Sequence, residues 1–294
     1  MKITVVGSIN VDLVTRCSRF PQAGETVFGD DFTVFPGGKG ANQAIACAKL
    51  GATVRMVGCV GNDANGRFLL DNFLTQSVDI ENVSVLNGIS SGVAPILIAE
   101  NDNRIVVVPG ANGKVTCEIV DSAKEILLGS DMVMLQLEIP MVTVEYTAAF
   151  CYENHIPIIL NPAPAQRLSK QLINNVTYIT PNEIEITQVF NNSFEKVIAD
   201  FPNKVIMTAG SQGTYFHNGT SIVHTPAQKV EVVDTTGAGD TFNGALAIGI
   251  SEGMKLQDAI VFASKAASLS IKKLGAQSAM PTRTELENEE MKVA

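Results

Sequence analysis

The sequence predicts an α/β fold: a three-layer sandwich whose central, mostly parallel sheet is flanked by helices, with a small β sheet attached. Through most of the 294 residues, short apolar or β-branched runs alternate with longer helical segments, which is typical of parallel βαβ units. Two pairs of β-rich runs instead follow one another with no helix between them, so they cannot be ordinary crossover units. The sequence contains no repeats or Pro/Ser-rich linkers, so we expect residues 1–294 to form a single domain.

The expected elements follow from these runs. Strands of the central sheet are expected at 3–6, 54–60, 132–137, 157–160, 178–180, 205–208 and 229–233. Helices are expected at 44–50, 65–75, 115–128, 141–154, from 181 onward, at 242–250 and at 256–272. The tail at 284–294 is expected to be a frayed helix and a plain solvated end. The small sheet is expected from about 11–16, 26–35, 93–99 and 104–108, and the last two runs make a hairpin around 100–103. An extension of the central sheet's edge is the alternative for these runs. A second hairpin, 214–216 with 221–225, turns on Asn218-Gly219.

Composition and charge restrict the class of protein. Apolar residues make up 46%, and the net charge of −9 argues against nucleic acid or an anionic membrane surface as the main partner. The five cysteines show no CxxC spacing, which fits reduced thiols. The N-terminus reaches a strand at once, without the features of a signal peptide, and no apolar run approaches the ~20 residues that span a bilayer. We therefore expect a cytoplasmic protein.

The stretch 234–244, DTTGAGDTFNG, predicts an anion site. Gly237 and Gly239 lie where a tight strand-to-helix turn needs residues without a Cβ. The N–H groups of Gly237, Ala238 and Gly239 would then face an anion at the positive end of the following helix. Asp240, in the first turn, has two plausible roles: it stabilises the helix start, or it accepts a proton beside a bound anion.

A second glycine-rich stretch, 36–43, precedes a helix but matches neither a phosphate loop nor a dinucleotide fingerprint. One interpretation is a flexible turn with Asn42 as the helix cap. The other is a surface of close approach on which Gly38, Lys39 and Asn42 meet a polyhydroxy ligand.

Polar residues also follow several expected strands, where open α/β sheets bind ligands. Asn10 and Asp12 come after the first strand and, two residues apart in extended backbone, can face the same side. Glu138 and the segment 161–164 follow later strands. The three histidines share no metal-ligand spacing, and we expect them to be ordinary structural or surface residues.

These motifs occur together and in one order: Asn10 and Asp12, GGKGAN at 37–42, Glu138, NPAP at 161–164, TPNE at 180–183, TAGSQG at 208–213 and DTTGAGDTFNG at 234–244. From residue 1 to about 281, the chain resembles the ribokinase-like carbohydrate kinases. The resemblance implies ATP-dependent transfer to the 5-hydroxyl of D-ribose, with Mg²⁺ and a K⁺-type activating cation. It also implies a homodimer in which the small sheets pair and act as lids over the sugar.

The resemblance also assigns site residues. The positions that match the family's sugar contacts are Asn10, Asp12, Gly38, Lys39, Gly40, Asn42 and Glu138. Asp240 matches the catalytic base, beside Gly237, Ala238 and Gly239. The nucleotide positions are Asn182, Thr208, Gly210, Ser211, Gly213, Gly239 and Ser264. The monovalent-cation positions are Asp234, Thr236, Ser270, Lys273, Gly275 and Ala279, and the magnesium-associated positions are Asn182 and Glu185.

Two of these positions depart from the family pattern. Ala279 stands where a serine hydroxyl is common, and Ser264 replaces the more usual His or Asn, so one cation ligand and the adenine contact are in doubt. Two alternative functions stay open. One is a kinase of the same fold acting on another small sugar or nucleoside, such as 2-deoxyribose. The other is a sugar-binding relative without catalysis, against which the intact Asp240 and its glycine turn argue.

Overall fold

The computed structural model describes residues 1–100 and 102–291. Its central sheet has the strand order β11-β10-β9-β1-β4-β5, and β6 also pairs with β4. Every ladder between these strands is parallel. The strands are β1 (Lys2–Val6), β4 (Thr53–Gly61), β5 (Val78–Asp79), β6 (Val83–Leu86), β9 (Met132–Leu135), β10 (Ile158–Leu160) and β11 (Tyr178–Ile179).

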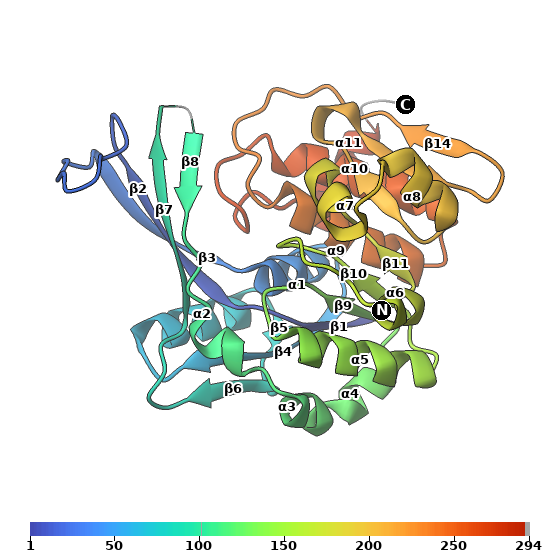
Figure 1. The fold of residues 1–294 in the computed structure, drawn as a ribbon, viewed down its shortest axis with the longest axis horizontal. Helices are drawn as coiled ribbons and strands as arrows, with labels where there is room; N and C mark the ends of the chain where they lie inside the picture. The colour runs from blue at the N-terminus through green and yellow to red at the C-terminus, as the bar shows by residue number, and fades with distance from the viewer. Residues whose placement is uncertain (101, 292–294) are drawn as a thin grey trace.

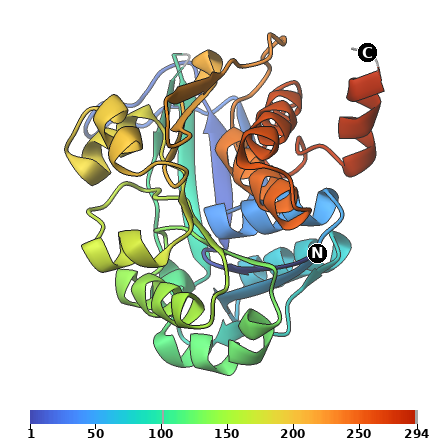
Figure 2. The same ribbon diagram turned by 90° about the vertical axis from the view of Figure 1, so that its right-hand side faces the viewer.

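Helices cover both faces of this sheet, because its strands are apolar on both sides. Ile3 and Val5 of β1 belong to one core, while Val6 belongs to the other, as the period of two in a strand requires. The first core is covered by α1 (Lys39–Lys49), α2 (Ala64–Thr75), α9 (Ala238–Ser251) and α10 (Leu256–Ser270). The second is covered by α3 (Cys117–Ser122), α4 (Lys124–Leu128), α5 (Met141–Glu153), α6 (Lys170–Asn175), α7 (Glu183–Phe190) and α8 (Phe194–Asp200). The expected three layers are confirmed (Figure 2).

The small sheet is separate from the central sheet, as expected, and is not an extension of its edge. Its order is β3-β2-β7-β8, and the strands are β2 (Asn10–Arg16), β3 (Asp31–Gly37), β7 (Gly92–Ala99) and β8 (Asp102–Ile105). Strands β2 and β7 are parallel, and the two outer pairs are antiparallel. Figure 1 shows β2, β7 and β8 rising away from the central sheet. Only Gly7–Ile9 separate β1 from β2, so one continuous segment serves both sheets.

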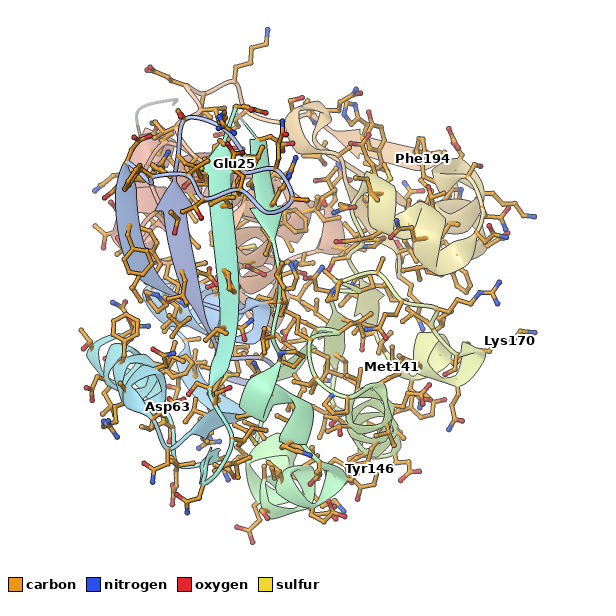
Figure 3. The ribbon with its side chains drawn as sticks, turned by 60° about the vertical axis from the view of Figure 1, so that its left-hand side comes forward. Glu25, Asp63, Met141, Tyr146, Lys170 and Phe194 are labelled. Atoms are coloured by element: carbon orange, nitrogen blue, oxygen red, sulfur yellow. The ribbon has the colours of Figure 1, made fainter. Side chains whose placement is uncertain are left out.

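Asp63 fixes the base of the small sheet to the main body. Its carboxylate caps α2 by accepting from Gly66 N at 2.7 Å, and it also accepts from Ser91 N at 2.8 Å, directly before β7. These hydrogen bonds lower the pKa of Asp63 although burial opposes them. In Figure 3, Asp63 lies at the base of the small sheet and Glu25 at its opposite end, in the loop between β2 and β3.

The expected hairpin at 214–225 is confirmed as β13 (Thr214–His217) and β14 (Ile222–Thr225). Strand β12 (Ile206–Thr208) pairs with β13, and a parallel bridge between Ile179 and Val205 continues the edge of the central sheet. The 3₁₀ turn Gly210–Gln212 joins β12 to β13.

The structure corrects three expectations near the site. Residues 229–233 form no strand: Val233 N bonds instead to the Ile271 carbonyl at 2.8 Å, and Val232 and Val233 are exposed. Helix α1 begins at Lys39 rather than at 44, because packing overrides the low helix propensity of its glycines. Asn42 is therefore inside the helix and is not its cap.

Other bounds differ for local reasons. Strand β3 begins at Asp31 rather than 26, because the preceding loop turns at Gly24 (φ +80°) and is held by the Arg19–Glu25 ion pair. The helix expected at 115–128 is broken at Ala123 into α3 and α4. Strand β8 begins at Asp102, inside the expected turn, because the chain turns at Glu100 (φ +55°); it ends at Ile105, and residue 101 lies outside the described residues.

The acidic tail forms a helix, α11 (Arg283–Met291), as expected, but this helix is packed on the protein and is not a plain solvated end. Leu286 is 1% exposed in the first core, and Arg283 pairs with Glu252 at 2.9 Å. These contacts hold the helix against the first core and the end of α9, whose C-cap is Glu252. Residues 292–294 of the expected tail lie outside the described residues.

Helices α1 and α9 pack at unusually short range through small residues. A Cβ built on Gly244 would lie 2.6 Å from the Ala46 Cβ and 3.2 Å from Cys47 N. Only glycine therefore permits this approach. The contact aligns the first turns of the two helices, where Asn42 and Asp240 lie.

We expect Gly244→Val to lower the free energy of unfolding by about 1–3 kcal/mol, because the added methyls cannot fit between the helices. Urea denaturation measures this loss. Gly239→Ala is the matched control: the position lies in the same helix, and a Cβ there has no atom within 4 Å. Equal effects of the two substitutions would contradict the importance of the contact.

Candidate active site

Four charged side chains from distant parts of the chain share one region at the carboxyl ends of the central strands. Asp12 comes from β2, Lys39 from the start of α1, Glu138 from the loop after β9 and Asp240 from the first turn of α9. We call these four residues the carboxylate cluster, although it includes Lys39. The pKa values of Asp12, Lys39 and Asp240 are each shifted by the charges of other residues in the cluster. The early and late motifs therefore form one site.

Burial and like charges act together on Asp12. Burial, followed by the charges of Glu138 and Asp240, raises the pKa of Asp12 to about 7, and Lys39 opposes this. Burial alone would lower the pKa of Lys39, but the carboxylates of Asp240, Glu138, Glu185 and Asp12 raise it. The lysine is therefore charged at neutral pH, whereas the carboxyl group of Asp12 is harder to ionise than that of an ordinary aspartate.

Two amide side chains hold the Asp240 carboxylate. Asn42 Nδ2 donates to one oxygen at 2.9 Å, and Gln43 Nε2 donates to the other at 3.1 Å. Burial raises the pKa of Asp240, while Lys39 and the two amides oppose the rise. Asp240 is 8% exposed, so its carboxylate is fixed in direction at the edge of the site.

The start of α1 packs directly on the end of β1. A Cβ on Gly40 would lie 2.6 Å from Ser8 N, and Gly40 N donates to Ser8 Oγ at 3.1 Å. Ser8 Oγ donates in turn to Glu138, which also accepts from Lys39 N at 3.0 Å. The stretch 36–43 is thus closely packed on β1, and Gly38 (φ +89°) supplies the required backbone conformation, while its contact with a polyhydroxy ligand stays a prediction.

Asn10 is oriented by a residue that the sequence did not point to. Asn112 Nδ2 donates to Asn10 Oδ1 at 2.7 Å, and Asn112 Oδ1 accepts from Ile9 N at 2.8 Å. This bond orients the Asn10 carboxamide, so that its oxygen faces Asn112 and its NH₂ group points away from Asn112.

In the glycine turn before α9, Gly237 N and Gly239 N have no partner in the described residues, whereas Ala238 N donates to the Thr235 carbonyl at 3.2 Å. Gly237 is left-handed (φ +75°), and no side chain in the described residues caps this helix. A Cβ on Gly239 would meet no atom within 4 Å, so the first turn borders open space. A helix start of this kind, beside a carboxylate, can hold an anion.

The residues assigned to the nucleotide gather next to this helix start. Asn182 bridges Thr208 in parallel register, and the turn Gly210–Gln212 with Gly213 follows. Thr214 Oγ1 lies 3.4 Å from Ser264 Oγ. Because Ser264 belongs to α10, this contact places α10 beside the turn Gly210–Gln212. Thr180 Oγ1 donates to Asn243 at 2.6 Å and so ties this group to α9.

Asn182 and Glu185 form a capping box at the start of α7. Asn182 Oδ1 accepts from Glu185 N at 2.8 Å, and Glu185 Oε2 accepts from Asn182 N at 2.8 Å. Burial raises the pKa of Glu185, and both Lys39 and Asp240 act on it, so this carboxylate faces the site. The spacing therefore has a structural role whether or not magnesium is held there.

Asp234 joins the two loops that contain the monovalent-cation positions. Its carboxylate accepts from Thr236 N at 2.9 Å, Thr236 Oγ1 at 2.7 Å and Gly275 N at 2.9 Å. These bonds lower its pKa against the effect of burial. Ser270 Oγ bonds to the Ala267 carbonyl at 2.8 Å, and Lys273 pairs with Glu285 at 2.7 Å, so their side chains are engaged elsewhere. Ala279 offers only its main chain.

Several residues of the site were missed by sequence reasoning: Ser8, Gln43, Asn112, Gln136 and Gln277. Gln43 bonds both Asp240 and, at 3.2 Å, Asn161 Oδ1, while Gln136 Nε2 donates to Gln43 Oε1 at 2.7 Å. The available signal was the polar pair Asn42-Gln43 inside an otherwise alanine-rich helix.

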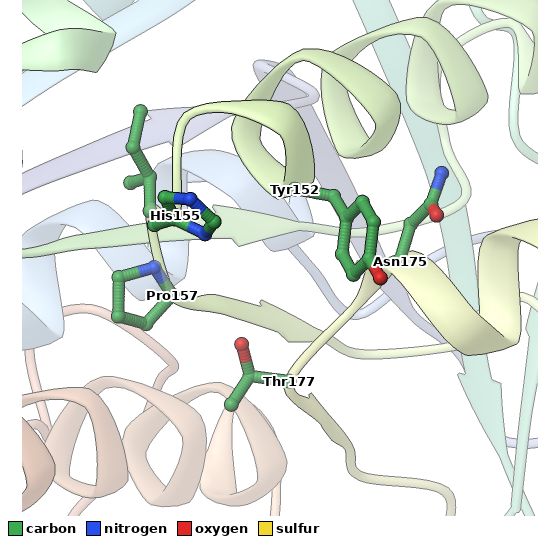
Figure 4. Close-up of a pocket in the computed structure, with 6 residues that line it drawn as sticks. Tyr152, His155, Pro157, Asn175 and Thr177 are labelled. Atoms are coloured by element: carbon green, nitrogen blue, oxygen red, sulfur yellow. The ribbon is translucent and has the colours of Figure 1, made fainter.

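Two pockets of about 250 Å³ lie outside the carboxylate cluster. One is open and lies at the amino end of β10, between Tyr152, His155 and Asn175 (Figure 4). Ligands in open α/β sheets bind at the opposite, carboxyl ends, so we set this pocket aside. The other lies behind α1 and is lined by Lys49, Asn72 and Gln277, among others.

Comparison with known proteins agrees with this geometry. Residues 1–283 match the pfkB family carbohydrate kinase model. The chain is 47% identical to the ribokinase of Lactococcus lactis (97% of this chain, 95% of the relative) and 46% identical to that of Bacillus subtilis (97% and 98%). The structure of Arabidopsis thaliana ribokinase complexed with ribose and ATP matches with a TM-score of 0.90 at 32% identity, covering 97% of both chains. No helix in the described residues is long and apolar enough to cross a membrane.

The raised pKa of Asp12 predicts a pH-dependent stability. Between the ordinary value near 4 and about 7, the folded protein binds a proton that the unfolded chain releases, so stability falls as pH rises through this window. We expect Asp12→Asn to be more stable than the parent by about 1 kcal/mol at pH 8, and by less at pH 5. Urea denaturation at both pH values measures the difference. The control is Asp71→Asn, at an exposed position, and parallel curves for Asp12→Asn and the parent would contradict the prediction.

Proposed function

The chain belongs to the pfkB family of carbohydrate kinases, and on this premise we propose that it transfers the γ-phosphoryl group of ATP to the 5-hydroxyl of D-ribose. The products are D-ribose 5-phosphate and ADP. The observation that carries the proposal is the convergence of Asp12 and Glu138, at the family's sugar positions, with Asp240, at the position of its base.

The sugar is held by the early part of the chain. Asp12 and Glu138 accept hydrogen bonds from ribose hydroxyls, and Asn10 and Asn42 donate through their NH₂ groups. Main-chain atoms of Gly38 and Gly40 lie at the base of the site, beside the charged Lys39. Fixing the attacking hydroxyl in line with the phosphorus can supply on the order of 7–11 kcal/mol of the barrier at best.

Asp240 removes the proton from the attacking hydroxyl. Two amides already direct its carboxylate, and general base catalysis contributes roughly 10²–10⁴ in rate. The N–H groups of Gly237 and Gly239 stabilise the charge that develops on the transferred phosphoryl group, each contributing about 10²–10³, whereas Ala238 N already donates to the Thr235 carbonyl. ATP lies beyond this turn, against Asn182, Thr208, Gly210, Ser211, Gly213 and Ser264.

The donor sets fit the two expected cations. Mg²⁺ takes one or two carboxylates together with phosphate oxygens and waters, and Glu185 beside Asn182 offers one carboxylate facing the site. When bound, Mg²⁺ neutralises charge on the phosphates. The K⁺ position is built from Asp234 and from main-chain oxygens of Thr236, Ser270, Lys273, Gly275 and Ala279, which are hard donors suited to a large monovalent ion. The lowered pKa of Asp234 keeps that carboxylate anionic.

The small sheet acts as a lid over the sugar and as the interface of a homodimer. Phe32 and Val34, two residues apart on β3 and so on one face of the sheet, are 60% and 40% exposed. Apolar side chains gathered on one sheet are typical of a surface that a second chain covers. Closure would keep water from replacing the sugar hydroxyl.

All five cysteines are free thiols, which supports a cytoplasmic location.

A coupled assay of ADP release with Mg-ATP tests the function. Ribose, 2-deoxyribose, fructose 6-phosphate and a nucleoside are compared as acceptors, with and without K⁺. We expect the highest kcat/KM with ribose and a gain on adding K⁺. Preference for another acceptor would favour a different kinase of the same fold, and binding of ribose without turnover would indicate a sugar-binding relative without catalysis.

In the same assay, we expect Asp240→Asn to reduce ribose-dependent turnover by roughly 10²–10⁴, because the proton acceptor is lost. ATP binding, measured by calorimetry, should persist. Asp258→Asn, at an exposed position on α10, is the control. Near-normal turnover by Asp240→Asn would remove this residue from the role of base.

For the dimer, we expect Phe32→Asp to convert two-chain particles to single chains in analytical ultracentrifugation, because a buried charge without a partner is costly. Val142→Asp is the matched control, since Val142 is 65% exposed on α5, away from the small sheet. An unchanged mass for Phe32→Asp, or an equal loss in both variants, would argue against this interface.

A further inference from the structure

A chain of amide hydrogen bonds leads from helix α2 to Asp240. Asn72 Nδ2 donates to Gln277 Oε1 at 2.8 Å, and Gln277 Nε2 donates to Asn42 Oδ1 at 2.9 Å. Asn42 Nδ2 then donates to Asp240 Oδ2 at 2.9 Å. Gln277 is 6% exposed and lies in the loop after Gly275, far from the sugar motifs in sequence.

The direction of this chain determines which end of Asn42 faces Asp240. A carboxamide has one donor end and one acceptor end. While Gln277 donates to Asn42 Oδ1, the NH₂ group of Asn42 must point at the carboxylate. If Asn42 were reversed, its oxygen would face Asp240, which would lose a donor and gain a repulsive neighbour.

We propose that Gln277 is a positioning residue for phosphoryl transfer: by fixing the orientation of Asn42, it holds the Asp240 carboxylate in the direction from which it accepts the substrate proton. This inference rests on the proposed function. Gln277 does not touch the substrate, and its effect passes through Asn42.

The backbone of Gln277 is anchored independently of its side chain. Lys49 Nζ donates to the Gln277 carbonyl at 2.7 Å and to the Met280 carbonyl at 3.1 Å. The side chain can therefore be changed while the loop stays tied to α1. This makes the amide group itself the variable in an experiment.

Two substitutions separate shape from hydrogen bonding. Gln277→Glu keeps the shape and the acceptor for Asn72, but turns the donor toward Asn42 into an acceptor, which favours the reversed Asn42. Gln277→Met removes the donor without adding charge. Gln76→Glu is the matched control, because Gln76 lines the same pocket and has no hydrogen bond to Asn42 in the described residues.

With ribose, we expect kcat to fall about tenfold in Gln277→Met and about a hundredfold in Gln277→Glu, while KM changes less. The rising limb of the pH profile of kcat should move to higher pH, because a carboxylate that loses an N–H donor has a higher pKa. The other charged groups that act on Asp240 (Asp12, Lys39, Glu138 and Glu185) are unchanged in every variant. Gln76→Glu should match the parent in both measurements.

The proposal is overturned if both Gln277 variants keep kcat within twofold and leave the pH profile in place, or if Gln76→Glu loses as much as Gln277→Glu. A fall in unfolding free energy without a shift of the profile would also overturn it, since that result means a structural role alone. If Gln277→Met does not fold, the shape-preserving Gln277→Glu decides. Failure of the proposed function is seen separately, as absence of ribose-dependent ADP release by the parent protein, and it would overturn the inference as well.

Discussion

The close contact of helices α1 and α9 is the constraint on which the site depends. Because Gly244 lets the two backbones approach at Ala46, Asp240 comes within hydrogen-bond reach of Asn42 and Gln43. About two hundred residues of chain separate Asn42 and Gln43 from Asp240, so no local interaction could align them. The packing of α1 against α9 in the core thus determines where Asp240 lies relative to Asn42 and Gln43.

The second constraint is electrostatic. Three carboxylates, Asp12, Glu138 and Asp240, share one partly buried region with Lys39. Such an arrangement costs stability in the empty protein, because burial and like charges both disfavour ionisation. A bound polyol would supply the missing hydrogen-bond donors. The cluster is therefore better matched to a ligand than to the unliganded state, as strained functional sites often are.

The sequence predicted the parts of the fold that are determined locally. Strands β1, β4 and β9 were expected because their apolar runs are buried on both faces, and Asp12, Glu138 and Asp240 followed from motifs. The sequence-based prediction was wrong where tertiary contacts determine the local structure. Residues 229–233 are β-rich but have no partner strand. Helix α1 begins among glycines because it packs on Ser8. Gln43 and Gln277 were missed since their partners lie 197 and 235 residues away. The role of an amide depends on its partner, which no local pattern contains.

Strand β1 passes into β2 through Gly7–Ile9 alone, and this short passage has a mechanical consequence. Any swing of the small sheet must bend the chain there, where Ser8 holds Glu138 and Asn112 holds Ile9. A movement of the small sheet would carry Asp12 with β2, whereas Glu138 and Asp240 belong to the main body. The proposed closure of the lid would therefore also bring the sugar-binding carboxylates together, so that exclusion of solvent and affinity for the sugar would change in the same step.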